Sequence, residues 1–460
     1  MYRVSIAALC AVLFVLVGSA LAQREPAPLP PEPERKPEGE VEFPKDEGEI
    51  EPEPAKPQSV KALAGYAHRV GVKSRKHADR IKAALDWLKD HQNVEGHWNP
   101  ISFGSDSKRE EAKHTYNLDH YMPGEEAGDH GWAESDVGLT GLSMLAFFAC
   151  GYNHRDGDYK EVLRRAIMYL RKIQGNDGCL GPKYDEHYIY NHGMAAAAMC
   201  EAYGLTNDTL LKAPCEYAVK FILNAQNEGK AWRYGVKPDA NDTSVTSWMI
   251  SALHSAKLAG IEADYKTAYA GATSWLDDMT GIWNGAPKTG YYEKAGNNAR
   301  LRTHQEYENN PAMDGVNIFL RALMGEKDWN ASDKTFAGQV ALFSKTPPSW
   351  QKLKIDYYYW YYATLALFQA GEKEWDAWEK LVTKMLLDHQ RGFVAADKGT
   401  TPATLDEHGS WDAVDCWAAG GGRVYSTAIN CLTLSVYDRY KRVIEKVDPK
   451  KKDPKKPKGK

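Results

Sequence analysis

The sequence has no excess of positive charge and, beyond its first residues, no long hydrophobic run. The chain of 460 residues carries 58 Lys and Arg against 62 Asp and Glu, a net charge of -4. Such a chain lacks the basic field that attracts nucleic acid, so we expect no DNA or RNA partner. No segment after residue 22 is long and apolar enough to span a bilayer, which excludes a multi-pass membrane protein. Because 43% of the residues are hydrophobic, we predict a large buried core.

Cysteine is scarce, and its spacing resembles no metal knuckle. The chain has 7 Cys. Those that follow the first 22 residues are Cys150, Cys179, Cys200, Cys215, Cys416 and Cys431. In an oxidising compartment these would allow up to three disulfides, whereas their places in apolar runs suit buried free thiols equally well. We predict neither a metal site nor a cofactor.

The two ends of the chain differ from its body in composition. Residues 1–22 combine a basic start, an apolar stretch and small residues, which is typical of a secretory signal peptide. We therefore expect a secreted or periplasmic protein, with an uncleaved membrane anchor as the alternative. Residues 23–59, rich in Pro and Glu, predict a disordered linker. Residues 447–460 predict a disordered basic tail that could touch anionic surfaces, so the folded domain should span residues 60–446.

A repeated helical segment runs through this domain. In each copy a large apolar residue precedes a Gln by five positions, and the pairs are Trp87 with Gln92, Tyr169 with Gln174, Phe221 with Gln226 and Met385 with Gln390. Trp275 begins a further copy in which Thr280 replaces the Gln, and residues 335–350 supply a degenerate sixth. The domain is therefore predicted to be a repeat protein with six units.

Each repeated segment precedes a second, more apolar segment rich in small residues. The predicted second helices are Asp136–Cys150, His187–Tyr203, Ser244–Ala259, Ala312–Met324, Tyr357–Ala370 and Arg423–Tyr440. The first helices carry charge on one face and should face water, whereas the nearly uncharged second helices should lie inside. The predicted fold class is all-α, with about six helical hairpins. The hairpins could close into an α-α toroid or remain an open solenoid, because periodicity alone does not establish closure.

The first repeat resembles a known family. The segment from Leu85 to Trp98, with Gln92 and Gly96 inside it, is similar to the Gln-Trp repeat of squalene cyclases, terpenoid cyclases and protein prenyltransferase β-subunits. Asn241–Val245, Tyr359–Thr364 and Gly421–Thr427 look like segments of exported bacterial proteins with prenyltransferase and squalene-oxidase repeats. The resemblance covers about residues 78–440. It implies an α-α toroid of six hairpins in which Gln and Trp tie each outer helix to the next turn.

The sequence departs from the catalytic motifs of that superfamily. The Asp-x-Asp-Asp acid of the cyclases is missing, since Asp277 and Asp278 follow Trp275. Asp415 and Cys416 are adjacent, whereas the zinc site of the prenyltransferases has a residue between its Asp and its Cys. The resemblance therefore transfers no known chemistry, and it leaves open whether the protein is an enzyme.

Polar residues cluster where the predicted inner helices begin. If those helices are parallel, their starts should surround an axial funnel, although each carboxylate could equally be an ordinary helix cap. Our catalytic candidates are Asp356, Asp136, Asp314, Asp415, His187 and His192. Our ligand-binding candidates are Tyr188, Tyr190, Trp248, Tyr357, Trp360 and Arg423.

Three hypotheses for the function follow. The first is a toroid that binds an apolar or glycan ligand, such as an isoprenoid, in its aromatic funnel. The second is an exported glycosidase, lyase or cyclase-like enzyme with two carboxylates across the axis. The third is a protein-docking scaffold, in which the funnel would be packed solid.

Overall fold

The computed structural model describes residues 76–115, 129–296, 310–326, 328–330, 332–351 and 354–439. All of them belong to one compact unit of the chain, residues 59–460. The predicted signal peptide, the linker of residues 23–59 and the basic tail of residues 447–460 lie outside the described residues. Nothing in the described part tests these three predictions.

Twelve of the described helices form six hairpins, each with a first helix on the outside and a second helix on the inside. The outer helices are α2 (Ala78–Asp90), α4 (Lys160–Lys172), α6 (Lys212–Ala225), α8 (Tyr265–Met279), α11 (Lys334–Lys345) and α13 (Glu372–Asp388). The inner helices are α3 (Asp136–Ala149), α5 (Tyr188–Thr206), α7 (Thr243–Leu258), α10 (Ala312–Met324), α12 (Tyr357–Ala370) and α14 (Ala418–Leu434). Shorter elements are the 3-10 turns Ala133–Ser135, Thr209–Leu211 and Ala395–Asp397, and α15 (Val436–Arg439).

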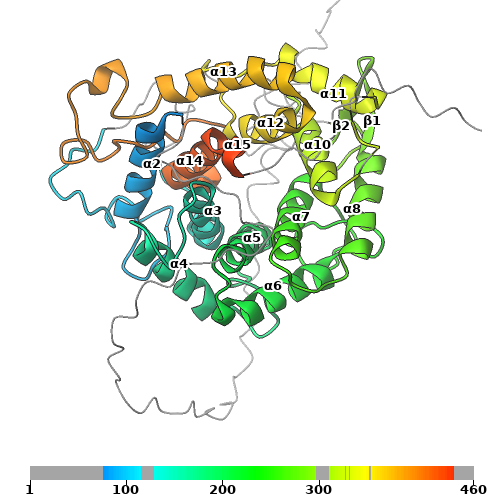
Figure 1. The fold of residues 1–460 in the computed structure, drawn as a ribbon, viewed down its shortest axis with the longest axis horizontal. Helices are drawn as coiled ribbons and strands as arrows, with labels where there is room; N and C mark the ends of the chain where they lie inside the picture. The colour runs from blue at the N-terminus through cyan, green and yellow to red at the C-terminus, as the bar shows by residue number, and fades with distance from the viewer. Residues whose placement is uncertain are drawn as a thin grey trace, which may run out of the picture. The chain divides into compact units, whose positions relative to one another are not determined.

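The six inner helices form a closed ring. Each packs against the next in chain order, from α3 through α5, α7, α10 and α12 to α14, and α14 packs back against α3. Figure 1 shows this inner ring surrounded by the outer helices. The fold is therefore an α-α toroid, and the open solenoid is excluded.

The burial of the helices follows their composition. Outer helix α4 is strongly amphipathic, with Leu163, Ala166 and Leu170 buried and its basic residues on the other face. Inner helix α3 is buried over nearly all of its length, because it contacts outer helices on one side and the ring interior on the other. Among the described residues, no helix has the combination of length and hydrophobicity that a bilayer span requires. All six described cysteines are buried.

Two predicted helix ends differ from the structure. Helix α5 continues through Gly204 and ends at Thr206, where Asn207 adopts the left-handed conformation with φ 51°. Helix α14 begins at Ala418 rather than Arg423, with a break at Gly422 where φ is 59°. At Gly422 a Cβ atom would lie 2.2 Å from the Asp129 carbonyl oxygen, so only glycine fits there.

The repeated Gln residues link neighbouring hairpins. In each case the side-chain Nε2 donates one hydrogen bond to a carbonyl of its own turn and one to a carbonyl of the next outer helix. The second acceptors are Val162 for Gln92, Pro214 for Gln174, Ala268 for Gln226 and Arg80 for Gln390. The last bond joins the sixth hairpin to the first, so the same contact that builds the ring also closes it.

Glycine and tryptophan complete this turn. Gly96 has φ 101°, and a Cβ atom there would lie 2.4 Å from the Arg165 carbonyl oxygen, which explains why the turn carries glycine. The Trp98 indole Nε1 donates a 2.7 Å hydrogen bond to the Leu88 carbonyl at the end of α2. Trp232 and Trp411 make the same bond in later copies. This confirms the structural role that the family resemblance implies for the repeat.

The fourth repeat, which has Thr280 in place of Gln, uses a different connection. Strand β1 (Thr280–Trp283) pairs antiparallel with β2 (Ala286–Thr289) through an Asn-Gly turn. Gln339 of α11 donates a hydrogen bond to the Thr289 hydroxyl, which attaches the hairpin to the next outer helix. The all-α prediction omitted this small sheet, although Asn-Gly between two extended segments is a strong hairpin signal.

We predict that Gln390→Leu lowers the free energy of unfolding by about 2–4 kcal/mol, because it removes the hydrogen bonds to the buried Gly409 carbonyl and to the Arg80 carbonyl of α2. Denaturant unfolding checks this. The control is Gln351→Leu, since Gln351 is exposed and its change should stay within about 0.5 kcal/mol. Equal stability of the two variants would contradict the role of the Gln contact in closing the ring.

Candidate functional site

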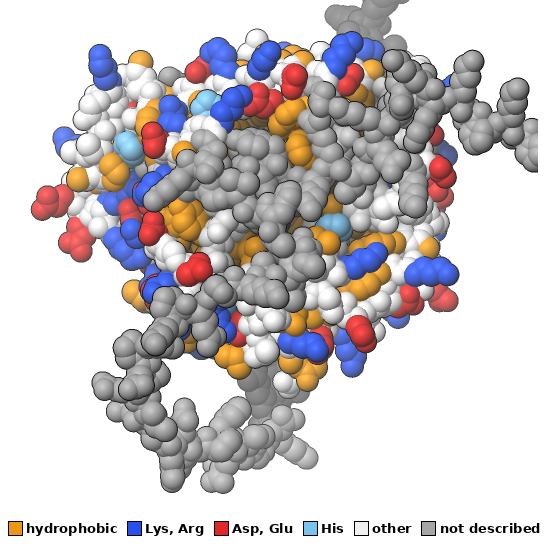
Figure 2. All heavy atoms as spheres, viewed as in Figure 1, with side chains coloured by type: hydrophobic (Ala, Val, Ile, Leu, Met, Phe, Trp, Pro, Cys, Tyr) orange, Lys and Arg blue, Asp and Glu red, His pale blue; other side chains and the backbone are white. Residues whose placement is uncertain are grey.

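A cavity of about 330 Å³ lies on the axis of the toroid, among the first turns of the six inner helices. Every inner helix contributes to its wall. The described lining residues are Trp132, Ser135, Leu139, Leu142, His187, Tyr190, Asn191, Met194, Tyr234, Ser244, Trp248, Tyr291, Met313, Tyr358, Trp417, Gly420, Gly421 and Tyr425. Figure 2 views the molecule along the axis of the ring, with charged side chains toward the rim and hydrophobic side chains visible nearer the middle. The predicted aromatic funnel is therefore present.

The described wall of the cavity is almost entirely apolar and aromatic. It contains no Asp, Glu, Lys or Arg. His187 is its one imidazole, and its Nδ1 lies 3.1 Å from the Asp185 carboxylate. The His187 ring lies 5.4 Å from Trp132 and 5.4 Å from Tyr234, measured between ring centroids. Such a wall suits an apolar ligand with one polar end.

The polar part of the wall is a group of tyrosine hydroxyls. The hydroxyls of Tyr234 and Tyr291 lie 2.8 Å apart, and either can be the donor. Tyr190 is the third member, with its ring 6.0 Å from that of Tyr234. Burial raises the pKa of all three, so their hydroxyls stay protonated at neutral pH. We call Tyr190, Tyr234 and Tyr291 the tyrosine cluster.

Asp242 lies behind the tyrosine cluster and caps α7. One carboxylate oxygen accepts a 2.6 Å hydrogen bond from the Val245 amide. The other, Oδ2, lies 3.9 Å from Arg233 Nε and makes no hydrogen bond of regular geometry in the described structure. Burial raises the pKa of Asp242 to about 7, although backbone hydrogen bonding, Arg233 and the Tyr291 hydroxyl oppose this rise.

Three of the sequence-predicted site residues line the cavity, namely His187, Tyr190 and Trp248. Asp356 lies one layer behind the wall. Its carboxylate caps α12 through the Tyr359 amide at 2.8 Å and accepts a 3.0 Å hydrogen bond from the indole of Trp417, which does line the cavity. Asp356 therefore reaches the cavity wall through its hydrogen bond to Trp417.

The other aromatic candidates point away from the axis. Tyr357 is fully buried and donates to the Asp412 carbonyl, and Trp360 packs beside it with the ring centroids 5.5 Å apart. Tyr188 is half-buried, with Lys183 Nζ 5.8 Å from its ring. The prediction that these three line the funnel is wrong, because the helices bury both faces and different residues face the axis.

Asp136 and His192 contact outer helices instead of the cavity. Asp136 accepts a 2.8 Å hydrogen bond from the Tyr169 hydroxyl of α4. His192 accepts from the Leu180 amide at Nδ1 and lies 3.2 Å from the Ala218 carbonyl at Nε2. Burial lowers the pKa of His192 to about 4, so the imidazole stays neutral. Both residues therefore support the packing of the rings.

Asp314 and Asp415 are also buried outside the cavity. Asp314 accepts a 2.8 Å hydrogen bond from the Thr289 amide and so ties α10 to strand β2. Burial raises its pKa to about 7. Asp415 accepts from the Tyr357 amide at 3.1 Å and so binds the first turn of α12.

Arg423 belongs to a buried ionic network rather than to the funnel. Its guanidinium donates to Asp129 at 2.5 Å, to Asp412 at 2.6 Å and to the Ser410 hydroxyl at 2.8 Å. Arg391 also contacts Asp412, with 3.1 Å between Nη1 and Oδ1. Arg423 therefore does not line the described cavity, and its donors are engaged by the turns around α14.

We predict that Arg423→Gln lowers the free energy of unfolding by about 3–5 kcal/mol, because the buried carboxylates of Asp129 and Asp412 lose their shared cation. Chemical denaturation measures this. The matched control is Arg171→Gln on the exposed face of α4, which should change stability by less than about 0.5 kcal/mol. An Arg423→Gln protein as stable as the native chain would show that the network is dispensable.

A pH-dependent effect is expected at Asp314. Its raised pKa means that the folded chain holds this proton more tightly than the unfolded chain does, so its contribution to stability is present below pH 4 and is lost as the pH rises through 7. Asp314→Asn cannot ionise. Relative to the native protein, the variant should therefore gain stability between pH 4 and pH 8, as measured by urea unfolding. Asp376→Asn, on the exposed face of α13, is the control, and a pH-independent difference for Asp314→Asn would contradict this account.

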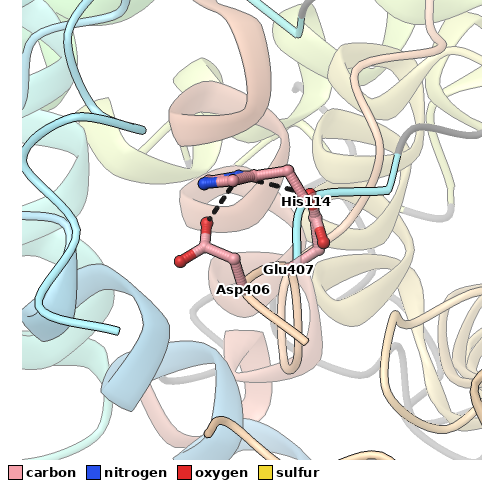
Figure 3. A group of neighbouring side chains, drawn as sticks. All are labelled: His114, Asp406 and Glu407. Atoms are coloured by element: carbon pink, nitrogen blue, oxygen red, sulfur yellow. Dashed lines mark ion pairs between the residues drawn. The ribbon is translucent and has the colours of Figure 1, made fainter. Parts of the chain in front are cut away.

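One group of side chains in the described part of the chain could bind a metal ion. It consists of His114, Asp406 and Glu407, whose ligand atoms lie within 4.8 Å of one another. Figure 3 shows the His114 ring beside both carboxylates. Its Nδ1 lies 3.3 Å from Asp406 and 3.8 Å from Glu407. Asp406 also pairs with His91 at 2.9 Å, and Glu407 accepts from the Thr115 amide. These contacts attach the segment before residue 115 to the turn before α14. The sequence analysis did not identify this group, whose members come from distant segments.

The sequence analysis also did not identify several residues of the cavity wall. Trp132, Tyr234, Tyr291 and Trp417 come from the connections between outer and inner helices, where no periodicity predicts orientation. Tyr358 follows the candidate Tyr357 in α12 but, unlike it, lines the cavity, and its hydroxyl lies 2.9 Å from the Ser244 hydroxyl. The only available signal was the high content of Tyr and Trp.

Comparison with known proteins gives likenesses of structure only. No family model and no curated protein matches the chain. Among solved structures, the chain is similar to the type II terpene cyclase MstE from Scytonema, in complex with its product merosterolic acid A, at 14% identity and a TM-score of 0.46. That likeness covers 78% of this chain and 96% of the cyclase.

Two further solved structures are similar to this chain. One is an alpha-1,6-mannanase, GH76A of Salegentibacter sp. HEL1_6, in complex with alpha-1,6-mannotriose, at 11% identity and a TM-score of 0.47, over 78% of this chain and 98% of the mannanase. The other is a polysaccharide lyase at 12% identity and a TM-score of 0.38, over 78% of this chain and 52% of the lyase. These likenesses assign no function, so a proposal for the function must rest on the residues of the cavity.

Proposed function

We propose that the protein binds an apolar small molecule of the isoprenoid type in its axial cavity. The observation that carries this proposal is the composition of the described wall, which is aromatic and aliphatic and includes no carboxylate or permanent cation. A space of about 330 Å³ is at the lower end of the range usual for small-molecule sites. Burial of an apolar chain against Trp248, Trp417 and Leu142 would supply the binding free energy.

The wall favours this hypothesis over the two alternatives. A glycosidase needs two carboxylates that face the substrate, roughly 5 to 10 Å apart, whereas every described catalytic candidate with a carboxylate lies behind the wall or against an outer helix. A scaffold without a ligand would have a solid centre, whereas the described residues enclose a space.

A glycan is a weaker candidate ligand than an isoprenoid. Sugars need many hydrogen-bonding partners as well as aromatic faces, whereas polar side chains of this wall already form hydrogen bonds within the protein. Asn191, for example, accepts from the Gly138 amide and donates to the Glu134 carbonyl. Ser244 is bonded to the Tyr358 hydroxyl. Among the described wall residues, the tyrosine cluster and His187 form the main polar region, which suits a single polar group at one end of a ligand.

Titration with farnesol, followed by tryptophan fluorescence, tests the proposal. The expected result is saturable binding that Trp417→Leu weakens by about 10-fold, because this ring forms part of the wall. The matched control is Trp360→Leu. Trp360 lies in α12 outside the described cavity wall and packs against Tyr357, so this change should lower stability but leave the farnesol affinity of the folded protein unchanged. Binding of mannotriose with no response to farnesol would overturn the proposal.

A further inference from the structure

We infer that His114, Asp406 and Glu407 bind a divalent transition-metal ion, and that zinc is the ion they fit best. One imidazole nitrogen and two carboxylate oxygens are the protein ligands, which leaves a fourth position to water. The ion would join the connection between α2 and α3 to the turn before α14, and so stabilise the closure of the ring. None of the three residues belongs to the described wall of the axial cavity, so this inference is independent of the proposed function.

The first observation is the burial of two neighbouring carboxylates. The side chains of Asp406 and Glu407 are each 2% exposed, whereas that of His114 is 45% exposed. Buried carboxylates lose their hydration and need positive charge close by. The half-exposed imidazole leaves the group accessible to an ion from the solvent.

The second observation is a carboxylate oxygen without a partner. Glu407 Oε1 accepts a 2.9 Å hydrogen bond from the Thr115 amide, whereas Oε2 is buried and has no hydrogen-bond partner within the described structure. Such an oxygen costs stability unless a proton or a cation satisfies it. Arg109 lies in the same region, but its ion pair is with Asp90, at 3.0 Å, and its Nη1 donates to backbone carbonyls.

The spacing of the three side chains matches ligands of a shared ion. His114 Nδ1 lies 3.3 Å from Asp406 Oδ2 and 3.8 Å from Glu407 Oε1. A charge-assisted hydrogen bond between such groups is usually about 2.7–2.9 Å long. Ligand atoms that lie about 2.0–2.1 Å from a tetrahedral zinc ion are roughly 3.3–3.4 Å from one another. Small movements of the side chains would therefore bring all three onto one ion.

Hydrogen bonds already hold these ligands in position. The Ser107 hydroxyl donates a 2.5 Å hydrogen bond to Asp406 Oδ1, and His91 Nε2 lies 2.9 Å from Asp406 Oδ2. The backbone places His114 opposite Asp406, because the Asp406 amide donates a 3.1 Å hydrogen bond to the Lys113 carbonyl. Contacts of this kind orient the carboxylate ligands of metal sites.

The chemistry of the ligands favours zinc over the alkaline-earth ions. Imidazole is a ligand for zinc and its transition-metal neighbours, whereas calcium takes oxygen ligands. Among transition metals, manganese should bind this mixed site more weakly than zinc, as the usual order of affinities predicts. The sequence-based prediction of no metal site rested on the cysteines, and none of them belongs to this group.

Zinc titration of the full chain by calorimetry, after treatment with EDTA and dialysis, tests the inference. The expected result is saturable binding of one zinc ion per chain. His114→Ala and Glu407→Gln should each raise the Kd by about 100-fold, and Ser107→Ala by about 10-fold, because a lost ligand costs more than a lost supporting contact. The matched control is His130→Ala, an exposed histidine outside the group, which should leave the Kd unchanged.

Two further measurements separate a lost site from a lost fold. Saturating zinc should raise the Tm of the native chain by roughly 3–5 °C, because the ion binds only the folded form. His114→Ala should have nearly the native Tm without metal, since this side chain is half-exposed, and zinc should not raise it. X-ray absorption at the zinc edge should show imidazole and oxygen ligands without sulfur.

Several outcomes would overturn the inference. It is wrong if zinc does not bind, if His114→Ala keeps the native Kd, or if the absorption spectrum shows a sulfur ligand. Calcium binding as tight as zinc binding would also overturn it, because calcium does not select a site with an imidazole. Farnesol affinity should be the same in His114→Ala as in the native chain, so this inference and the proposed function stand or fall separately.

Discussion

The double hydrogen bond made by each repeated glutamine is the contact on which the rest of the toroid depends. A helical hairpin with an apolar inner helix cannot bury that helix alone, so it needs neighbours on both sides. Gln92, Gln174 and Gln226 provide this link by bonding their own turn and the next outer helix with one amide group. Gln390 makes the same contact with α2, and this closes the ring.

Closure creates the cavity and also explains its composition. In a closed ring of parallel inner helices, the first turns of all six meet around one axis, where the described side chains leave a space of about 330 Å³. The carboxylates near those turns are needed elsewhere. Asp242 and Asp356 cap helices, and Asp129 and Asp412 neutralise Arg423. The wall is therefore left to aromatic and aliphatic side chains, which makes apolar binding the chemistry that the described site supports best.

The tyrosine cluster is the exception to this apolar wall. A buried carboxylate with an unsatisfied oxygen, such as Asp242, costs stability unless it gains a proton or a partner. The hydroxyls of Tyr291 and Tyr234, 2.8 Å apart, give the wall of the cavity its polar region.

The sequence by itself determined the hairpins, their order and the inside and outside helices, because these follow from local periodicity and from the repeated Gln, Gly and Trp. It also placed His187, Tyr190 and Trp248 at the funnel. Only the tertiary structure decided that Tyr358 rather than Tyr357 faces the axis, and that Arg423 is engaged by Asp129 across nearly three hundred residues. The reason is physical. An inner helix is buried on both faces, so its hydrophobic pattern no longer indicates which face meets the axis, and the remaining wall residues come from turns whose orientation is set by packing alone.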